Sequence, residues 1–575
     1  MRGVRLTGVI CGALVALAFA SPAALAAGGP ADWMYEPTSI SEIHLTLSPE
    51  SIAELEAEPK EYVEGTFSLA ETDGTPGTAA TFSPPLTVGI ELKGNIGSLR
   101  RVSEKAAFKI KFNKYVEGQS FLGLEKMTLN NMVQDPSMVH ETTTYQAFHD
   151  MDVPAPHVGF SYLTINGESY GLHLNIETQD AESLENEFGT PFTAPPQHLY
   201  AGEYGADASD APYGHSTSEK KWEALEVSEG KKKEKGDLEA LVAAVEATTP
   251  SFATRVANVA DLSEMTKDWL VEKYVGNWDG YAGNVDELHP NNYYLYSDAS
   301  GRFQLMPWGT DQTWQLGEEL NFENDGGILF SDCIADTAGC RQTYLAAAHE
   351  ALTVLNATSL DAVARCTASD LRPWQELEAR ISAQEKLPDP SADGAENLAM
   401  AAEEVHDTRT FIGERPEELA AFLGEPAPPP QATEPVCPPL RPIGGFPSPA
   451  GPDSASISTS TATAQPGTAP SARLRLGSIA SPRRGRKAAP VSVHLDAPGP
   501  GRLVVRGRYG RGGAEACRGT DKPSAAGKVT VACRLTARFG ALLDQRWRRI
   551  RIDARFAPAG GTAERVGRAI RLPRR

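Results

Sequence analysis

The chain has 575 residues and a formal net charge of −21 at neutral pH. That length is enough for two or three domains with a sizeable core. The charge is divided unevenly, because residues 471–575 hold 25 Lys+Arg against 6 Asp+Glu, a net +19, which leaves −40 on residues 1–470. The acidic part is therefore a poor candidate for nucleic-acid binding, and no specific nucleic-acid partner is expected. The basic part is either a surface that is attracted to an anionic envelope, polysaccharide or DNA, or a solvated arginine-rich surface.

The first 26 residues have the pattern of a secretory signal peptide. Arg2 and Arg5 precede an apolar run from Val9 to Phe19, and Ala24-Leu25-Ala26 supplies a small-residue cleavage site. We expect cleavage near Ala26, a mature protein that begins near Ala27, and a location outside the cell or in the cell envelope. No other apolar run approaches the length of a membrane span, so the mature chain is expected to be soluble or peripherally held, with no transmembrane helix.

Cysteine usage agrees with export, because six of the seven cysteines lie beyond the signal peptide. An even number of cysteines in an exported chain favours disulfides. Two pairs are close enough in sequence to close small loops and a third pair remains: Cys333 with Cys340, Cys517 with Cys533, and Cys366 with Cys437. A zinc site is the alternative, although the chain has no Cys-x-x-Cys pair.

The first half of a domain that we place at residues 27–424 is predicted to be rich in strands. The predicted strands cover residues 43–47, 62–68, 86–93, 108–112, 124–129, 159–165 and 170–177. The strand at 108–112 alternates apolar residues with Lys109 and Lys111, which therefore share one face. A short helix is predicted after Ser48 and a longer one over residues 137–151. Asn166-Gly167 is typical of a tight hairpin turn between two strands.

The second half of this domain is predicted to be mainly helical. Residues 203–236 are polar and are interpreted as a surface insertion. Helices are predicted over 238–256 and 262–275, and Asp261 with Glu264 has the spacing of a capping box at the start of the second. Two strands follow at 293–296 and 302–306, and helices are expected over most of 341–424.

Residues 425–471 are rich in Pro, Ser, Thr, Ala and Gly, and are predicted to be a disordered linker, since they have too few apolar residues to build a core. A second domain is placed at residues 472–575. Its short alternating runs cover residues 491–495, 502–509, 528–535 and 548–556. Gly/Pro-rich turns between them predict an antiparallel β-sandwich of immunoglobulin type, stapled by Cys517 and Cys533.

The segment from Asn277 to Trp314 is the best candidate for chemistry. An acidic loop with Asp279 leads through Asn292 into a strand, and the following strand ends close to Asp311. Phosphoryl transfer needs one carboxylate near the acceptor hydroxyl, and a second carboxylate with an amide oxygen for the metal. The alternative is a set of ordinary turns, which also favour Asp and Asn. A metal-dependent hydrolase is a third interpretation, which lacks a second cluster of His and Asp ligands.

Residues from about 43 to 424 resemble the spore-coat protein H (CotH) kinase family. The resemblance depends on an ordered series of short motifs. They are Lys93-Gly94-Asn95, Lys105 with 108–112, Phe121-Leu122-Gly123-Leu124, Leu129-Asn130-Asn131, Asp135, Val153-Pro154-Ala155, the hairpin 166–172 ending at Glu177, Asn292-Tyr293-Tyr294-Leu295-Tyr296, and Pro307-Trp308.

The resemblance implies an α+β, atypical protein-kinase-like domain. It would use ATP with Mg²⁺ or Mn²⁺ and phosphorylate Ser or Thr of envelope, coat or secreted proteins. Asp279 would orient the acceptor hydroxyl, while Asn292 and Asp311 would hold the metal. Either Lys109 or Lys111 would neutralise phosphate charge opposite Glu177, and the choice between the lysines is open because both share one face. The alternative interpretation is that Lys109 and Lys111 are lysines on a solvated strand face and that Glu177 is a surface ion-pair partner.

One motif departs from the family pattern. The family usually has Pro-Trp-Asp-x-Asp, and this chain has Gly309 in place of the first acid while Asp311 keeps the second. If the first acid is the essential metal ligand, the chain is a pseudokinase, because a charge that Mg²⁺ needs is lost. The alternative function is therefore a non-catalytic envelope-binding or surface-binding protein, which would contact anionic cell-wall polymer through its C-terminal domain.

Overall fold

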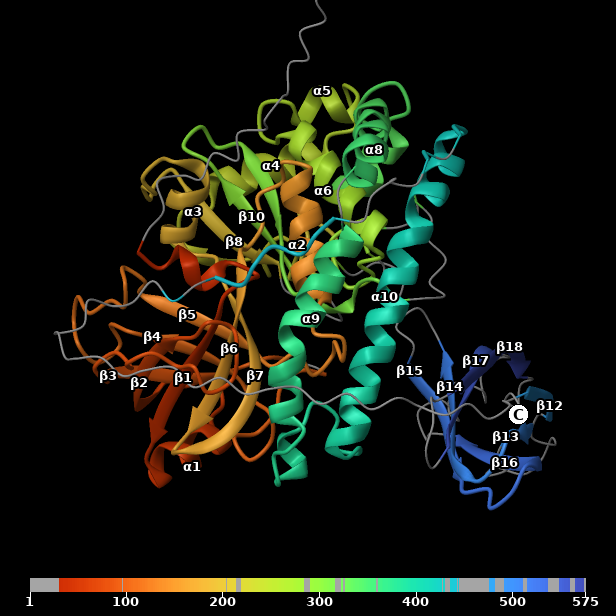
Figure 1. Cartoon of the computed structure of the whole chain (residues 1–575). Coiled ribbons are helices and arrows are strands. Elements are labelled where there is room, and N and C mark those ends of the chain that lie inside the picture. The colour runs from red at the N-terminus through yellow and green to blue at the C-terminus, as the bar shows by residue number, and fades with distance from the viewer. Residues whose placement is uncertain are drawn as a thin grey trace, which may run out of the picture.

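The structure is a computed structural model, shown in Figure 1. It describes residues 30–95, 97–202, 204–213, 219–283, 290–315, 322–323, 326–357, 360–426, 428–429, 435–441, 443, 475–480, 491–509, 514–535, 548–558 and 564–572. The predicted signal peptide and most of the predicted linker lie outside these residues. Within the described residues, no helix is both long and apolar enough to cross a membrane.

The N-terminal part forms a closed barrel with the strand order β1-β2-β3-β4-β5-β7-β6. Neighbouring strands are antiparallel except β1 and β6, whose parallel pairing closes the barrel. The strands are β1 (Ile40–Leu47), β2 (Val63–Glu71), β3 (Leu86–Lys93), β4 (Ala107–Lys111), β5 (Lys126–Asn130), β6 (Val158–Ile165) and β7 (Glu168–Ile176). The short helices η1 (Asp32–Tyr35) and α1 (Pro49–Ala57) belong to this part. Alternating apolar side chains of the strands fill the barrel, as their period of two requires.

The second part places helices around a smaller antiparallel sheet with the order β11-β10-β8-β9. Its strands are β8 (His198–Gly202), β9 (Glu226–Glu229), β10 (Tyr293–Ser297) and β11 (Phe303–Pro307). The helices are α2 (His140–Asp150), α3 (Ala181–Phe188), α4 (Gly236–Glu246), α5 (Phe252–Val256), α6 (Leu262–Val275), η2 (Thr310–Gln312), α7 (Ile328–Ala335), α8 (Cys340–Ala357), α9 (Leu360–Glu378), η3 (Gln384–Lys386) and α10 (Gly394–Leu423). In Figure 1, α9 and α10 run alongside both parts.

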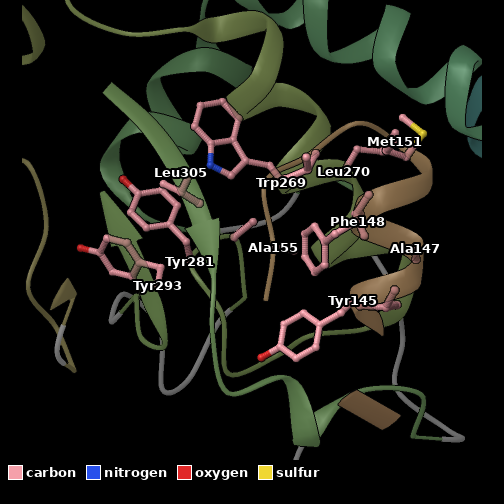
Figure 2. Packing of buried hydrophobic residues seen from close by; sticks show 14 of the residues in the cluster. Tyr145, Ala147, Phe148, Met151, Ala155, Trp269, Leu270, Tyr281, Tyr293 and Leu305 are labelled. Atoms are coloured by element: carbon pink, nitrogen blue, oxygen red, sulfur yellow. The ribbon is translucent and has the colours of Figure 1, made fainter. Parts of the chain in front are cut away.

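A large apolar core holds the second part together. Figure 2 shows Trp269 and Leu270 of α6 packed near Phe148 of α2, with Tyr281 and Tyr293 beside Leu305. Rings of Tyr281 and Tyr293 meet edge to face, with their centroids 4.7 Å apart. This core fixes α2, α6 and the β10–β11 hairpin relative to one another, and these are the elements that carry the candidate site.

The C-terminal domain is an all-β region with the strand order β12-β13-β16-β15-β14-β17-β18. Its strands are β12 (Arg475–Ala480), β13 (Val491–Ala497), β14 (Gly501–Tyr509), β15 (Ala514–Asp521), β16 (Gly527–Leu535), β17 (Arg548–Pro558) and β18 (Glu564–Leu572). The inward side chains form one apolar core, which includes both Cys517 and Cys533. This domain lies beside the N-terminal end of α10 (Figure 1).

Three details differ from the sequence prediction. Residues 203–236 are not only a surface insertion, because they supply strand β9 and place Ala206, Ala208 and Leu225 in the core of the second part. The single helix expected over 238–256 is wrong: α4 ends at Glu246, Pro250 follows, and α5 begins at Phe252. Asp261 caps α6 as expected, but Glu264 does not complete a capping box, because its carboxylate turns inward and accepts a hydrogen bond from the backbone of Leu305.

All three expected disulfides are present: Cys333–Cys340, Cys366–Cys437 and Cys517–Cys533. Cys366–Cys437 fastens the start of the predicted linker to α9. Nearby, the Arg441 guanidinium stacks on the Trp33 ring at 5.1 Å, so Arg441 also lies against the N-terminal part.

A buried ion pair joins the barrel to α9. Lys105 precedes β4 and contacts Glu378 at the end of α9, and the two side chains are only 1% and 4% exposed. Glu378 also packs against the backbone of Gly171, where a Cβ atom would meet its carboxylate oxygen at 2.1 Å. Burial lowers the pKa of Lys105 and raises that of Glu378, while the charge of each partner opposes these shifts.

This pair yields a stability prediction. Lys105→Met should lower the free energy of unfolding by about 3–5 kcal/mol, because it leaves the Glu378 carboxylate buried without a counter-charge. Adding Glu378→Met should recover most of that loss. Urea denaturation of wild type, both single variants and the double variant measures the coupling, and additive single losses would contradict it.

Candidate functional site

Lys93 is the last residue of β3 and points from the outer face of the barrel toward the second part. Gly94 follows with φ of +112°, and a Cβ atom there would lie 2.8 Å from the backbone nitrogen of Leu99. Glycine is therefore required for this sharp turn. The Lys93 ammonium lies 5.5 Å from the ring centroid of Trp308, which directly follows β11. A barrel residue thus reaches the end of the second sheet.

Glu141, in the first turn of α2, is the buried acid that faces Lys93. Its side chain accepts a hydrogen bond of 2.6 Å from Asn130 at the end of β5, and its other carboxylate oxygen has no hydrogen-bond partner among the described residues. Burial raises the pKa of Glu141 to about 8, and the nearby charge of Asp311 acts in the same direction. The positive charge of Lys93 opposes both effects, because it lies near enough to favour the ionised carboxylate.

Asp311 is the second acid that shares Lys93. It lies in the short helix η2, after the β10–β11 hairpin, and its backbone oxygen bonds to the His140 ring at 2.9 Å. Burial raises the pKa of Asp311 to about 7 against the attraction of Lys93, and the charges of Asp279 and Asp135 add to the rise. Asp311 thus lies near the charges of two other carboxylates and of Lys93.

Asp279 and Asn292 are joined directly. Asn292 Nδ2 donates to Asp279 Oδ2 at 2.9 Å and to its backbone oxygen at 3.1 Å, and Asn291 Nδ2 donates to Asp279 Oδ1 at 2.9 Å. Asn292 adopts φ of +50°, a left-handed conformation that asparagine tolerates better than most residues. Pairing of Tyr293 with Pro307 in the hairpin brings Asn292 beside Trp308, whose backbone nitrogen donates to it at 3.1 Å.

Glu272 of α6 holds the loop that carries Asp279. Its buried carboxylate accepts hydrogen bonds from the backbone nitrogens of Tyr281, at 2.9 Å, and Ala282. A Cβ atom at Gly280 would lie 2.2 Å from the same carboxylate, so the loop wraps closely around it. The loop is thereby fixed from the core side, and Asp279 is presented on the opposite side.

Asp135 and His140 fix the start of α2. Asp135 accepts hydrogen bonds from the backbone nitrogens of Ser137 and His140, at 2.9 and 2.8 Å. The other ring nitrogen of His140 bonds to Thr408 of α10 at 3.0 Å. Through these contacts α10, α2 and the segment of Asp311 are held in one arrangement.

Gly309, which replaces the usual first acid, lies in a left-handed turn with φ of +56°. A Cβ atom there would come within 3.0 Å of Asn292 Cγ, which is tighter than ordinary van der Waals contact. The glycine therefore lets the chain turn close to Asn292 before it reaches Asp311.

The structure brings together three of the residues that the sequence proposed, Asp279, Asn292 and Asp311. Lys109 lies on the same outer face of the barrel as Lys93 and pairs with Glu91 at 3.3 Å, with its side chain 48% exposed. Its charge is close enough to lower the pKa of Lys93.

The other two predicted residues lie farther along the barrel. Lys111 is the register neighbour of Lys126 on β5. Glu177 lies just beyond β7 and accepts hydrogen bonds from His157, with the ring nitrogen at 3.0 Å. It also lines a pocket with Lys126 and Asp180. No contact described in the structure joins Glu177 to Lys109 or Lys111.

Sequence reasoning assigned no role to Lys93, Glu141 or His140. Lys93 belongs to the Lys-Gly-Asn motif, which supported the family resemblance but did not indicate a role for the lysine. Glu141 had no signal of its own, because an acid in the first turn of a helix is commonly explained by the helix dipole. Only the packing of α2 against β5 turns it toward the barrel.

The oxygen atoms at the site fit a hard divalent cation. Asp279, Asn292 and Asp311 supply two carboxylates and an amide, the ligand types that Mg²⁺ uses, and burial leaves the carboxyl group of Asp311 in need of a counter-charge. Among the described residues, no group of three or more His, Cys, Asp or Glu is placed to hold a metal ion. A cation here would therefore need phosphate oxygens as well, as Mg²⁺ bound with nucleotides does.

Comparison with known proteins identifies the family. The family model described as CotH kinase protein matches residues 90–419, more than half of the chain. The site and the mixed α+β fold around it lie within that match, apart from the first strands of the barrel. The chain belongs to the CotH kinase family, which confirms the resemblance inferred from the motifs.

Two proteins of Bacillus subtilis (strain 168) are similar to the chain. It is 39% identical over 75 residues to an inner spore coat protein H-like protein, a match that covers 13% of this chain and 23% of that protein. It is 25% identical over 276 residues to inner spore coat protein H, covering 46% of this chain and 68% of that protein.

The α6 helix carries a buried acid whose titration can be tested. Asp268 is 0% exposed and neither carboxylate oxygen has a hydrogen-bond partner among the described residues. Burial raises its pKa well above the ordinary value, and Glu272 and Glu264 add to the rise. Folded protein therefore holds this proton to a higher pH than unfolded protein does, and stability is lost as pH rises through this window.

Asp268→Asn removes that penalty. We expect its melting temperature to exceed that of wild type by more at pH 8 than at pH 5, because the free-energy cost of keeping the folded wild-type carboxyl group protonated grows with each pH unit above its unfolded pKa. Calorimetry at both pH values measures the difference, with the exposed Glu239→Gln as a control. An equal shift at the two pH values would contradict the prediction.

Proposed function

We propose that this protein is an exported, ATP-dependent protein kinase that phosphorylates Ser or Thr of envelope, coat or secreted proteins with Mg²⁺ or Mn²⁺. The arrangement of Lys93 near Glu141 and Asp311, with Asp279 near Asp311, carries the proposal, because it joins a phosphate-binding cation to the acids that phosphoryl transfer needs. Family membership supports the same activity. Three disulfides and spore-coat relatives are compatible with a protein outside the cytosol.

Each residue has a role in this proposal. Asp279 orients the acceptor hydroxyl and takes its proton as the acceptor oxygen bonds to the γ-phosphorus. The bond from that phosphorus to the bridging oxygen breaks, and ADP leaves with the electron pair. Lys93 attracts the phosphates, and the charge of Glu141 nearby favours its ionised form. Asn292 and Asp311 would hold the divalent ion, which supplies neutralising charge to the phosphates when bound.

Lys93 and Glu141 here take the role that the sequence proposed for Lys109 or Lys111 with Glu177. Lys93 is closer to the acids of the second part, since Glu141 and Asp311 both act on its pKa. Lys109 then remains an auxiliary charge at the edge of the site. In fold, we propose a kinase-like two-part domain over 27–424, and an immunoglobulin-type sandwich over 472–575 joined by a linker at 425–471.

The two lysine assignments make opposite predictions. Lys93→Met should lower kcat/KM for phosphorylation of a casein-like acceptor by about 10²- to 10³-fold, the usual cost of removing one charge that stabilises the transition state. Lys109→Met should change it by less than about threefold, because that side chain is half exposed. Steady-state assays with labelled ATP measure both. The reverse order would restore the assignment to Lys109.

Asp279→Ala should lower kcat by about 10²- to 10⁴-fold with little effect on ATP binding, because it removes the proton acceptor and leaves the phosphate contacts. Label transfer with Mg²⁺ or Mn²⁺ gives kcat, and a thermal shift with ATP and metal gives binding. Wild type that shows a thermal shift but transfers no label, and behaves like Asp279→Ala, would refute the kinase.

That outcome would favour the second candidate, a pseudokinase that acts as a surface-binding protein. Two observations favour it: Gly309 stands where the family has an acid, and the basic C-terminal domain presents arginines on one sheet face. We propose that this domain binds anionic cell-wall polymer in either case. Binding that does not weaken as salt rises would contradict it, because charge attraction between exposed groups is screened by salt.

A further inference from the structure

One face of the C-terminal sheet carries a cluster of arginines. Residues alternate along β14, so Leu503 and Val505 enter the core while Arg502 and Arg506 point to the opposite face. In the neighbouring strands, Arg506 is the register partner of Arg518. Val504, between the two β14 arginines, is the register partner of Arg555 on β17. We call Arg502, Arg506, Arg518 and Arg555 the arginine face.

Like charges that face each other across strands repel, so this cluster favours an anionic partner. In the structure the partner is the N-terminal end of α10 and the segment before it. The contacts are Arg502 with Glu396, Arg555 with Glu403 at 3.4 Å, Arg506 with Asp389 at 4.0 Å, and Arg518 with the Ser391 hydroxyl at 3.4 Å.

The acids of α10 recur on one side of the helix. Glu403 and Glu404 follow Glu396 by seven and eight residues, which places them about two turns farther along the same side of the helix. They line a cavity of about 160 Å³ between the helix and the sheet, together with Met400 and Val504. The contact is therefore loosely packed and mainly charged.

Such an interface is weak and sensitive to salt. The Arg502 and Glu396 side chains are 43% and 31% exposed, and exposed ion pairs contribute little because water and salt screen them. The tether compensates for this weakness. The disulfide at Cys437 and the stacking of Arg441 on Trp33 hold one end of the connecting chain, and β12 begins at Arg475. Tethering raises the effective concentration of the two surfaces, so weak docking is populated but reversible.

We propose that the arginine face is the binding surface for an anionic polymer, and that α10 occupies it until such a polymer displaces the helix. The repeating charges of the polymer take the place of the Glu396 and Glu403 carboxylates, so docking and polymer binding exclude each other. This inference rests on the proposed polymer binding of the C-terminal domain. It does not depend on phosphoryl transfer.

The test uses the mature chain and dextran sulfate, with uncharged dextran as the matched control polymer. Glu396→Gln with Glu403→Gln should tighten binding of dextran sulfate by about threefold to tenfold at low salt, because the apparent dissociation constant is divided by the fraction of open protein. Glutamine keeps the side-chain shape at both positions, and at Glu396 it keeps an acceptor for the capping contact with Asp393. Arg502→Gln with Arg555→Gln should weaken binding at least tenfold.

A control variant and two further measurements separate the possible outcomes. Glu414→Gln with Glu417→Gln changes charge equally on exposed positions of α10 away from the arginine face, and should leave affinity unchanged. Small-angle scattering should show a larger radius of gyration for both test variants and for wild type at high salt. Polyphosphate, as a second polymer, distinguishes phosphate from sulfate recognition.

Unchanged affinity and unchanged radius in the Glu396/Glu403 variant would overturn the proposal. An expanded radius without binding of either polymer would refute the polymer-binding surface, and with it the proposed partner of this domain, while the docking contact would stand. Loss of kinase activity in any variant has no bearing on either result, so failure of the kinase proposal remains a separate finding.

Discussion

The arrangement of the site depends on the attraction between the Lys93 ammonium and two buried carboxylates. Lys93 belongs to the barrel, whereas Glu141 belongs to α2 and Asp311 to the turn after the second sheet. Burial raises the pKa of both acids, so without that lysine the second part would hold neighbouring carboxylates that repel each other or take up protons. The relative position of the barrel and the second part is therefore stabilised by this charge attraction as well as by packing.

The rest of the second part holds those acids where the lysine can reach them. Glu272 fixes the loop of Asp279 from the core side, and Arg415 of α10 donates to the backbone oxygen of Tyr274 at 2.6 Å, which caps the end of α6 just before that loop. His140 links α10 to the segment of Asp311. Hydrogen bonds from these side chains to the backbone thus fix the segments that carry Asp279 and Asp311.

Local patterns predicted most of the elements correctly, because hydrophobic alternation and capping residues act within a few residues of each other. The strand at 108–112 and the hairpin at Asn166-Gly167 were found in this way. Errors arose where one residue interrupts a pattern or serves a distant partner. Pro250 interrupts the helix that was predicted over 238–256. Glu264 does not cap α6 as expected, because its carboxylate accepts a hydrogen bond from the backbone of Leu305 in β11.

The sequence by itself determined the family, the mixed α+β class, the three cysteine pairs, and the candidate acids Asp279 and Asp311, since each is encoded in short motifs or in simple counting. Only the tertiary structure suggested Lys93 and Glu141 as the lysine and glutamate that we propose to act with those acids. That choice depends on strand register in the barrel and on the packing of α2, which join residues far apart in the chain. Lys93 belongs to the Lys-Gly-Asn motif and Lys109 to an alternating strand, but neither pattern shows which lysine lies near Asp311, and the fold alone gives them different surroundings.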